Sequence, residues 1–72
     1  MSFNVAVGGA VKAIRKEKGF TQNALADGIG VGKGHMSLME SGQRSITIES
    51  LELIAEALGV KASTIIRRAE KE

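Results

Sequence analysis

The sequence contains no cysteine, no proline, no tryptophan and no tyrosine, and it has a single histidine, His35. Without cysteine, neither a disulfide nor a thiolate metal site can add to the stability of the core. His35 has no potential co-ligands near it, so no metal and no other cofactor is expected. The same absences leave no nucleophile with an acid or base at a useful spacing, so the sequence does not predict an enzyme.

Long apolar runs are also missing. No stretch approaches the roughly 18 apolar residues that a membrane-spanning helix needs. The N-terminus has no basic region followed by an apolar run, as a signal peptide would. We therefore expect a cytoplasmic protein without a membrane partner. With 72 residues, residues 1–72 are expected to form one domain, near the lower size limit for a self-sufficient core.

The net charge is only +2, but its distribution is uneven. Residues 1–46 hold six lysines and arginines against three acidic residues, whereas residues 47–72 hold four against five. An excess of positive charge favours contact with a polyanion. The N-terminal part is therefore the half expected to face nucleic acid.

Apolar residues recur at helical spacing in five segments, and no segment alternates as a strand would. The predicted fold class is all-α, with helices over about residues 4–18, 21–27, 32–40, 47–58 and 62–69. Thr21 and Thr47 are the expected N-caps of the second and fourth helices. The stripe expected to be buried by the first helix is Phe3, Val7, Val11 and Ile14, and that of the fourth is Ile48, Leu51, Ile54, Ala55 and Leu58.

The segment from Thr21 to Gly42 carries the main functional signal. It predicts two short helices, with Met36 and Met39 placing the second helix back onto the first. Two short helices joined by a glycine-containing turn form a helix-turn-helix, whose second helix lies in the major groove of DNA. The turn is expected to consist of Gly28, Ile29, Gly30 and Val31. Because no strand precedes these glycines, the sequence GIGVGKGH predicts a turn and not a nucleotide site.

Several motifs follow one another in a set order. They are IRKEKGFTQNALA (14–26), Gly30-Val31, Met36-Ser37 with Glu40 and Gly42 following, and LELIAEALGV (51–60). Together they resemble the lambda-repressor-like Xre/Cro family of bacterial and phage DNA-binding domains. The resemblance implies a compact five-helix fold with the helix-turn-helix at helices two and three. It also implies a sequence-specific transcriptional regulator that binds double-stranded DNA as a homodimer on a (pseudo)palindromic operator.

Within this family the chain is similar to the controller proteins of restriction–modification systems. These proteins have about its size, and the chain also lacks the proline that many family members carry before the fourth helix. A Cro-like phage repressor and an antitoxin are alternatives within the same class. A protein-binding adaptor that keeps the fold without binding DNA is a further alternative, which Gly32, Gly34 and an exposed Leu38 would suit.

The resemblance implies several DNA-binding residues. Gln22, which follows the N-cap Thr21, matches a glutamine that clamps a backbone phosphate at a helix N-terminus. Gln43 and Arg44 stand where the family places phosphate contacts. The outward face of the recognition helix, where family members read base edges, carries Lys33, Gly34, Ser37 and Leu38, while His35 is expected to contact phosphate or to be a spectator.

The residues of the recognition helix suit different partners on DNA. Lys33 can donate to guanine O6 and N7, and Leu38 can pack on thymine methyl groups. Gly34 departs from the family pattern because it has no side chain to contact a base. It indicates either a close approach of the backbone to DNA or a site that is read with few contacts.

Two further sets of residues have expected structural roles. The resemblance implies an ion pair between Arg15 and Glu40 that ties the recognition helix to the scaffold. In the last helix, adjacent residues point about 100° apart, so Ile65 and Ile66 cannot both face one core. The expected dimer interface is therefore formed by the last helix, with Ile65, Ile66 and Ala69.

Overall fold

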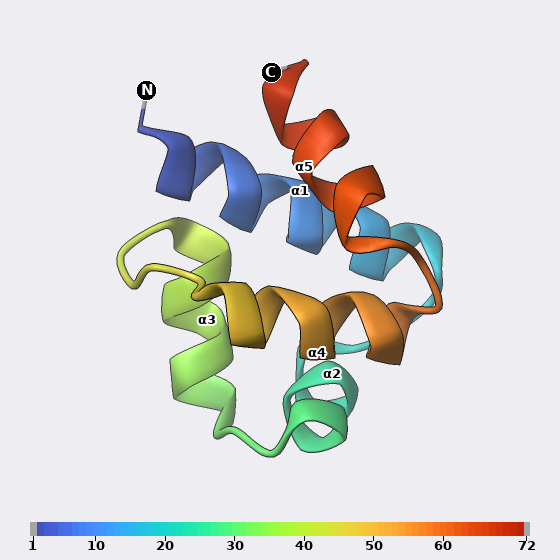
Figure 1. The fold of residues 1–72 in the computed structure, drawn as a ribbon. Coiled ribbons are helices and arrows are strands. Elements are labelled where there is room, and N and C mark those ends of the chain that lie inside the picture. The colour runs from blue at the N-terminus through green and yellow to red at the C-terminus, as the bar shows by residue number, and fades with distance from the viewer. Residues whose placement is uncertain (1, 72) are drawn as a thin grey trace.

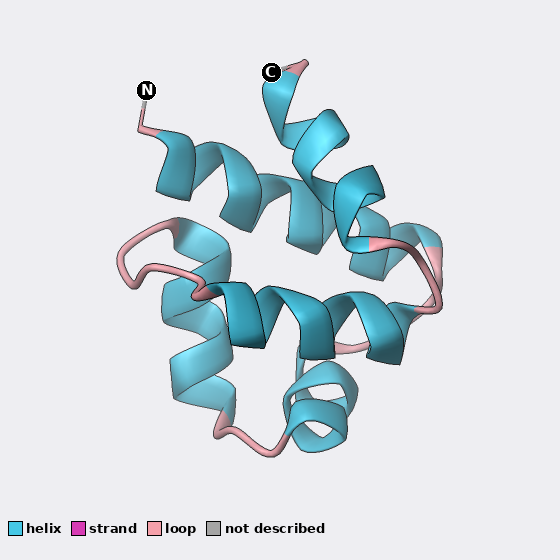
Figure 2. Cartoon of the chain, in the orientation of Figure 1, coloured by secondary structure: helices cyan, strands magenta, loops and turns pink. Residues whose placement is uncertain are grey.

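The computed structural model describes residues 2–71, and within this range the chain forms five helices and no strand (Figure 2). The helices are α1 (Phe3–Glu17), α2 (Gln22–Ile29), α3 (Lys33–Ser41), α4 (Ile48–Leu58) and α5 (Ala62–Glu70). This confirms the expected all-α fold. Each helix also begins and ends within two residues of the position predicted from the sequence.

The five helices surround one core. α1 packs against α5 and α3, while α4 packs against α2 and α5. In Figure 1, α3 runs across the directions of α1 and α4, and both chain ends lie at the α1–α5 end of the molecule. No helix in the described part of the chain is long and apolar enough to cross a membrane. The buried apolar side chains are Val7, Ala10, Val11, Ile14, Leu25, Ala26, Met36, Met39, Ile54, Ala55, Leu58, Ile65 and Ala69.

Two residues expected in the buried stripes are exposed instead. Phe3 is exposed, and Ile48 keeps 87% of its surface accessible. Each is the first residue of its helix, and contact of each stripe with the core begins about a turn later, at the buried Val7 and the half-buried Leu51. The predicted helical period is confirmed, but each buried stripe is about one turn shorter at its N-terminal end than the spacing predicts.

The turn between α2 and α3 is shorter than expected. Gly28 and Ile29 belong to α2, and the chain leaves the helix only at Gly30, which has a φ of 76°. A left-handed conformation of this kind is easily adopted by glycine and is common after a helix. The amide of Val31 then donates to the carbonyl of Ala26 at 3.0 Å, which closes the end of α2.

α1 crosses the C-terminal end of α3 so closely that the backbones of the two helices are almost in contact at Gly8. A Cβ atom placed on Gly8 would lie 2.7 Å from the carbonyl oxygen of Glu40 and would also overlap that of Met39. One turn earlier, Val5 lies against Gly42, the residue that ends α3 with a φ of 82°. This close crossing places the end of the predicted recognition helix directly on the scaffold.

Candidate nucleic-acid interface

The first turn of α2 begins at a side-chain cap. The hydroxyl of Thr21 accepts a hydrogen bond from the backbone N–H of Ala24 at 3.0 Å. The preceding N–H groups of a helix have no acceptor within the helix. Because the N-terminus also carries the positive end of the helix dipole, this end of α2 is suited to an anion such as phosphate. Thr21 is exposed there, and Gln22 is half-buried beside it.

α3 has one buried face and one face open to solvent. Met36, Met39 and Glu40 point into the molecule. Lys33 and Leu38 are exposed, and His35 is half-buried. Gly34 and Ser37 are exposed as well, and a Cβ atom on Gly34 would meet no other atom. The residues expected to read bases therefore lie on the free face of the helix, where a backbone approach at Gly34 is not obstructed.

The loop after α3 is held in place from two sides. The backbone N–H groups of Gln43 and Arg44 both donate to the carbonyl of Leu38, at 3.0 and 3.1 Å. From α1, the amide of Asn4 donates to the hydroxyl of Ser45 at 3.1 Å. The side chains of Gln43 and Arg44 are exposed. The loop thus presents one cation and one amide beside the C-terminal end of α3.

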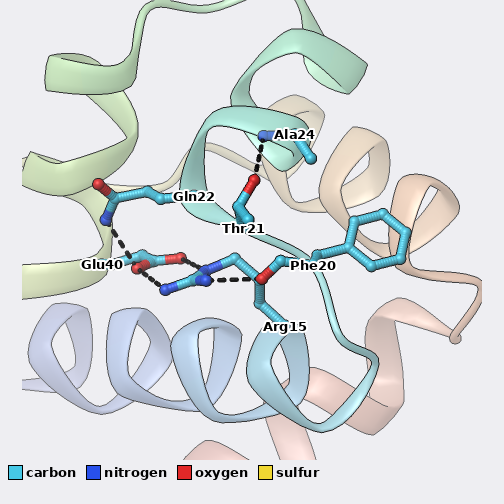
Figure 3. A network of polar contacts seen from close by, with 6 residues as sticks. All are labelled: Arg15, Phe20, Thr21, Gln22, Ala24 and Glu40. Atoms are coloured by element: carbon cyan, nitrogen blue, oxygen red, sulfur yellow. Dashed lines mark hydrogen bonds and ion pairs between the residues drawn. The ribbon is translucent and has the colours of Figure 1, made fainter.

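A buried polar network joins α1, α2 and α3 (Figure 3). Arg15 Nε donates to Glu40 Oε2 at 2.7 Å, and Arg15 Nη2 donates to Glu40 Oε1 at 3.1 Å. Arg15 Nη1 also donates to the carbonyl of Phe20, in the link between α1 and α2, at 2.8 Å. These are the two residues for which the resemblance implies an ion pair. Their side chains keep only 8% and 2% of their surface accessible.

The network has one member that the sequence did not suggest. The side-chain amide of Gln22 donates from Nε2 to Glu40 Oε1 at 3.0 Å. Eighteen residues separate the two side chains, so no local spacing predicts the contact. The link of Asn4 to Ser45 was missed for the same reason, because it joins residues 41 positions apart. The one available signal was the expected pairing of Glu40 with Arg15. A buried carboxylate needs its lone pairs satisfied, which points to a further hydrogen-bond donor beside Arg15.

The expected dimer residues of α5 need a correction. Ile65 is fully buried, with 0% of its surface accessible, and Ala69 is buried beside it in the core of the monomer. Ile66 is half-buried. The side chains of Ile65 and Ala69 are packed inside the monomer, so a partner chain can contact them only if α5 separates from α1. Of the three residues, only Ile66 reaches the surface.

No cluster of three or more potential metal ligands is present among residues 2–71. In the same range, every buried side-chain nitrogen or oxygen atom has a hydrogen-bond partner. Accessible polar groups lie on the free face of α3, at the start of α2 and in the loop after α3. This surface offers hydrogen-bond donors and positive charge, which suits a ligand rich in phosphate oxygens.

Comparisons with known proteins agree with this reading. The helix-turn-helix family profile (HTH_3) matches residues 11–65. The control protein C.MunI of Mycoplasma sp is 33% identical over 66 residues, which is 90% of this chain and 89% of that protein. The chain therefore belongs to the helix-turn-helix family, in its Xre/Cro-like group.

Other relatives are longer. The chain is 35% identical over 60 residues to the immunity repressor protein of Bacillus phage phi105 but spans 42% of its length. It is 36% identical to the competence pilus inhibition repressor of Acinetobacter baylyi and spans 58% of that protein. In these relatives the matched domain is one part of a larger chain.

Solved structures share the whole fold. The clp gene regulator ClgR from Corynebacterium glutamicum superimposes with a TM-score of 0.96 at 28% identity, over 99% of this chain and 92% of that one. The wild-type restriction–modification controller protein C.Esp1396I superimposes with a TM-score of 0.87 at 34% identity, again over 99% and 92% of the two chains. The five-helix arrangement is thus that of known gene regulators.

Proposed function

We propose that this chain is a transcriptional regulator that binds double-stranded DNA by inserting α3 into the major groove. The observation that carries the proposal is the free face of α3, with Lys33 and Ser37 exposed between Gln22 at the start of α2 and Arg44 in the following loop. In a helix-turn-helix, the second helix reads bases while flanking groups contact phosphates. The relatives described above are named as repressors, controllers or gene regulators, and none as an enzyme.

In this proposal, Arg44 and Lys33 contact different parts of DNA. Arg44 neutralises a phosphate, so Arg44→Ala should weaken binding to every duplex alike and reduce the slope of log affinity against log salt by about 0.9. Lys33 contacts a base edge, so Lys33→Ala should also change which sequence is preferred. Selection of bound sequences from a random duplex pool, followed by affinity measurements over a range of salt, tests both.

The same experiment separates this proposal from the protein-binding adaptor that Gly34 and the exposed Leu38 would suit. The proposal would be contradicted if the chain does not bind DNA, or if its affinity for DNA does not change between about 50 and 200 mM salt. If both variants lower affinity uniformly, Lys33 contacts only phosphate. Binding that depends only on phosphates and shows no sequence preference would contradict the proposal that the chain recognises an operator.

The proposal includes a homodimer on an operator with two half-sites about one helical turn apart, because paired recognition helices require a twofold axis. With Ile65 buried, the support comes from the outer faces of α4 and α5. α4 exposes Leu53 among Glu49, Glu52 and Glu56. At the end of α5, Arg67 and the following Lys71 are exposed on either side of Glu70. In a twofold dimer, the acidic face of α4 in one copy can pair with the cations at the end of α5 in the second copy, and the reverse.

Sedimentation equilibrium tests the dimer. The parent should associate with a dissociation constant in the micromolar range, and Leu53→Asp should weaken association because it replaces an exposed apolar side chain with a strongly hydrated one. Ile66→Asp should weaken it as well, while Ile48→Asp shows whether the exposed start of α4 contributes. A parent that stays monomeric at high concentration, or folded Leu53 and Ile66 variants that associate as the parent does, would end this part of the proposal.

Within the class, we propose a cytoplasmic regulator of the restriction–modification controller type. Both C.MunI and C.Esp1396I are matched over nearly their full length. A phage repressor and an antitoxin share the same domain. Neighbouring genes for an endonuclease and a methyltransferase would support the controller, whereas an integrase gene or a toxin gene would support one of the other two.

A further inference from the structure

The buried Arg15–Glu40 pair has a third partner that faces the proposed DNA surface. Glu40 Oε1 accepts hydrogen bonds from Arg15 Nη2 at 3.1 Å and from Gln22 Nε2 at 3.0 Å. Gln22 is the first residue of α2 and is half-buried. Figure 3 shows its amide nitrogen turned toward Glu40 and its carbonyl oxygen turned away from it. The side chain is therefore held in one orientation.

The acceptor that holds Gln22 is itself rigidly placed. Arg15 binds both carboxylate oxygens of Glu40 and also the carbonyl of Phe20. Because only 2% of the Glu40 side chain is accessible, water competes poorly for the carboxylate. A hydrogen bond to an ionised acceptor is also stronger than one between neutral groups. The position of Glu40 thus determines where the amide nitrogen of Gln22 lies.

The orientation of this amide decides what Gln22 can bind. A phosphate oxygen accepts hydrogen bonds and cannot donate one, so only the NH₂ group of glutamine is useful to it. A freely rotating amide presents its carbonyl oxygen as readily as its nitrogen. With one N–H of Gln22 bonded to Glu40, the nitrogen stays in place and its second N–H is left for another acceptor.

We propose that Glu40 is a positioning residue for DNA binding, which acts by orienting the side chain of Gln22 toward a backbone phosphate. This inference rests on the proposed function, because it assigns Gln22 a phosphate contact. Arg15 makes the arrangement compatible with DNA, since an unpaired carboxylate next to a phosphate would repel it. The network therefore serves both the packing of α3 and the phosphate contact of α2.

The first test needs no substitution. The chain has two glutamines, so the side-chain amide of Gln43 is an internal reference for that of Gln22. Gln43 is exposed, and its side-chain amide donates to the hydroxyl of the exposed Ser41 at 3.1 Å. By NMR, the amide protons of Gln22 should exchange with solvent about tenfold more slowly than those of Gln43. Equal exchange rates would overturn the proposal, even if the protein binds DNA.

The second test is a double-mutant cycle on affinity for a short duplex of mixed sequence at low salt. Gln22→Ala should weaken binding about tenfold, the size of one hydrogen bond to a charged group. Glu40→Asp keeps the charge but shortens the side chain, and should weaken binding several-fold in the parent. In the Gln22→Ala background, Glu40→Asp should change affinity less than about twofold, because the residue it positions is gone.

The matched control is Glu17→Asp, the same shortening in an exposed pair outside the proposed DNA surface, and it should leave affinity unchanged. If Glu40→Asp weakens binding equally with and without Gln22, Glu40 has only a structural role and the proposal fails. If Gln22 is protected from exchange but the parent does not bind the duplex, the proposed function fails and the positioning role fails with it. The exchange measurement uses the unaltered chain, so it remains decisive even if Glu40→Asp does not fold.

Discussion

Two arginine–glutamate pairs among residues 2–71 have similar geometry and opposite surroundings. Arg15 binds Glu40 with two hydrogen bonds of 2.7 and 3.1 Å, and Arg68 binds Glu17 with two of 2.9 and 3.0 Å. The side chains of the first pair are 8% and 2% accessible, whereas those of the second are 37% and 56% accessible. Bond lengths alone would rank the pairs as equals, but their surroundings make one indispensable and the other replaceable.

The difference follows from solvation. An exposed pair exchanges strong hydration for a weak, screened attraction, so its net contribution is small. In a buried pair each charge depends on the other, because water is no longer available to either one. The two pairs also connect different elements: the exposed pair joins the end of α1 to α5, while the buried pair joins α1 to the end of α3. The indispensable pair is thus the one beside the proposed DNA surface.

Removing one partner of the buried pair should have the largest effect on stability. Glu40→Ala leaves the guanidinium of Arg15 buried without its counter-charge, and the free energy of unfolding should fall by about 3–5 kcal/mol. Urea denaturation followed by circular dichroism measures this change. In the control, Arg15→Met combined with Glu40→Met removes both charges and should be less destabilising than Glu40→Ala. A Glu40→Ala protein as stable as the parent would contradict the buried arrangement.

Disturbing the helix crossing that buries the pair should have a smaller effect. Gly8→Ala would push a methyl group against the carbonyl oxygens of Met39 and Glu40. Overpacking of this kind should lower the free energy of unfolding by about 1–3 kcal/mol. The neighbouring Gly9 lies in the same helix with no atom near its missing Cβ. Gly9→Ala should therefore stabilise the protein by about 0.5–1 kcal/mol. If Gly8→Ala and Gly9→Ala change the free energy of unfolding equally, α1 does not approach α3 as closely as the structure has it.

These glycines illustrate what the sequence could and could not predict. The helices follow from apolar spacing, and the caps follow from Thr21 and Thr47, because both are local properties of the chain. From sequence alone, Gly8 and Gly9 look like the same weakness in a helix. Only the tertiary structure distinguishes them, since the oxygen atoms that require a glycine at position 8 come from residues about thirty positions further on.

The candidate site divides in the same way. The motifs indicate which face of α3 is free, and the family resemblance implies the pairing of Arg15 with Glu40. The contact of Gln22 with Glu40 depends on the side-chain rotamers of residues on two different helices, and no periodicity in the sequence predicts these rotamers. The expectation that Ile65 and Ile66 cannot both face one core was wrong, since Ile65 is fully buried and Ile66 packs partly against the same core. Both isoleucines share a helical face with Ala62 and Ala69, so spacing alone does not show that Ile65 is the fully buried one; packing against the rest of the fold decides it.

The exposed pair should give the smallest effect, and one that depends on pH. The hydrogen bond from Arg68 lowers the pKa of Glu17 below its ordinary value, with a further lowering from the charges of Arg68 and Lys18. A carboxyl group whose pKa is lower in the folded state binds protons more weakly there than in the unfolded chain. Its contribution to stability is therefore present above the pKa of the unfolded carboxyl and is lost as pH falls through the folded pKa.

Glu17→Gln removes this contribution and leaves the fold in place, because both side chains are open to solvent. Urea midpoints of the parent and of Glu17→Gln should differ slightly at neutral pH and converge in acid. Added salt should also reduce the difference at neutral pH, since exposed charges are screened. The Glu40→Ala deficit should persist in high salt, because a buried guanidinium is screened much less. If salt removes both deficits alike, the two pairs do not differ in burial as the structure has them.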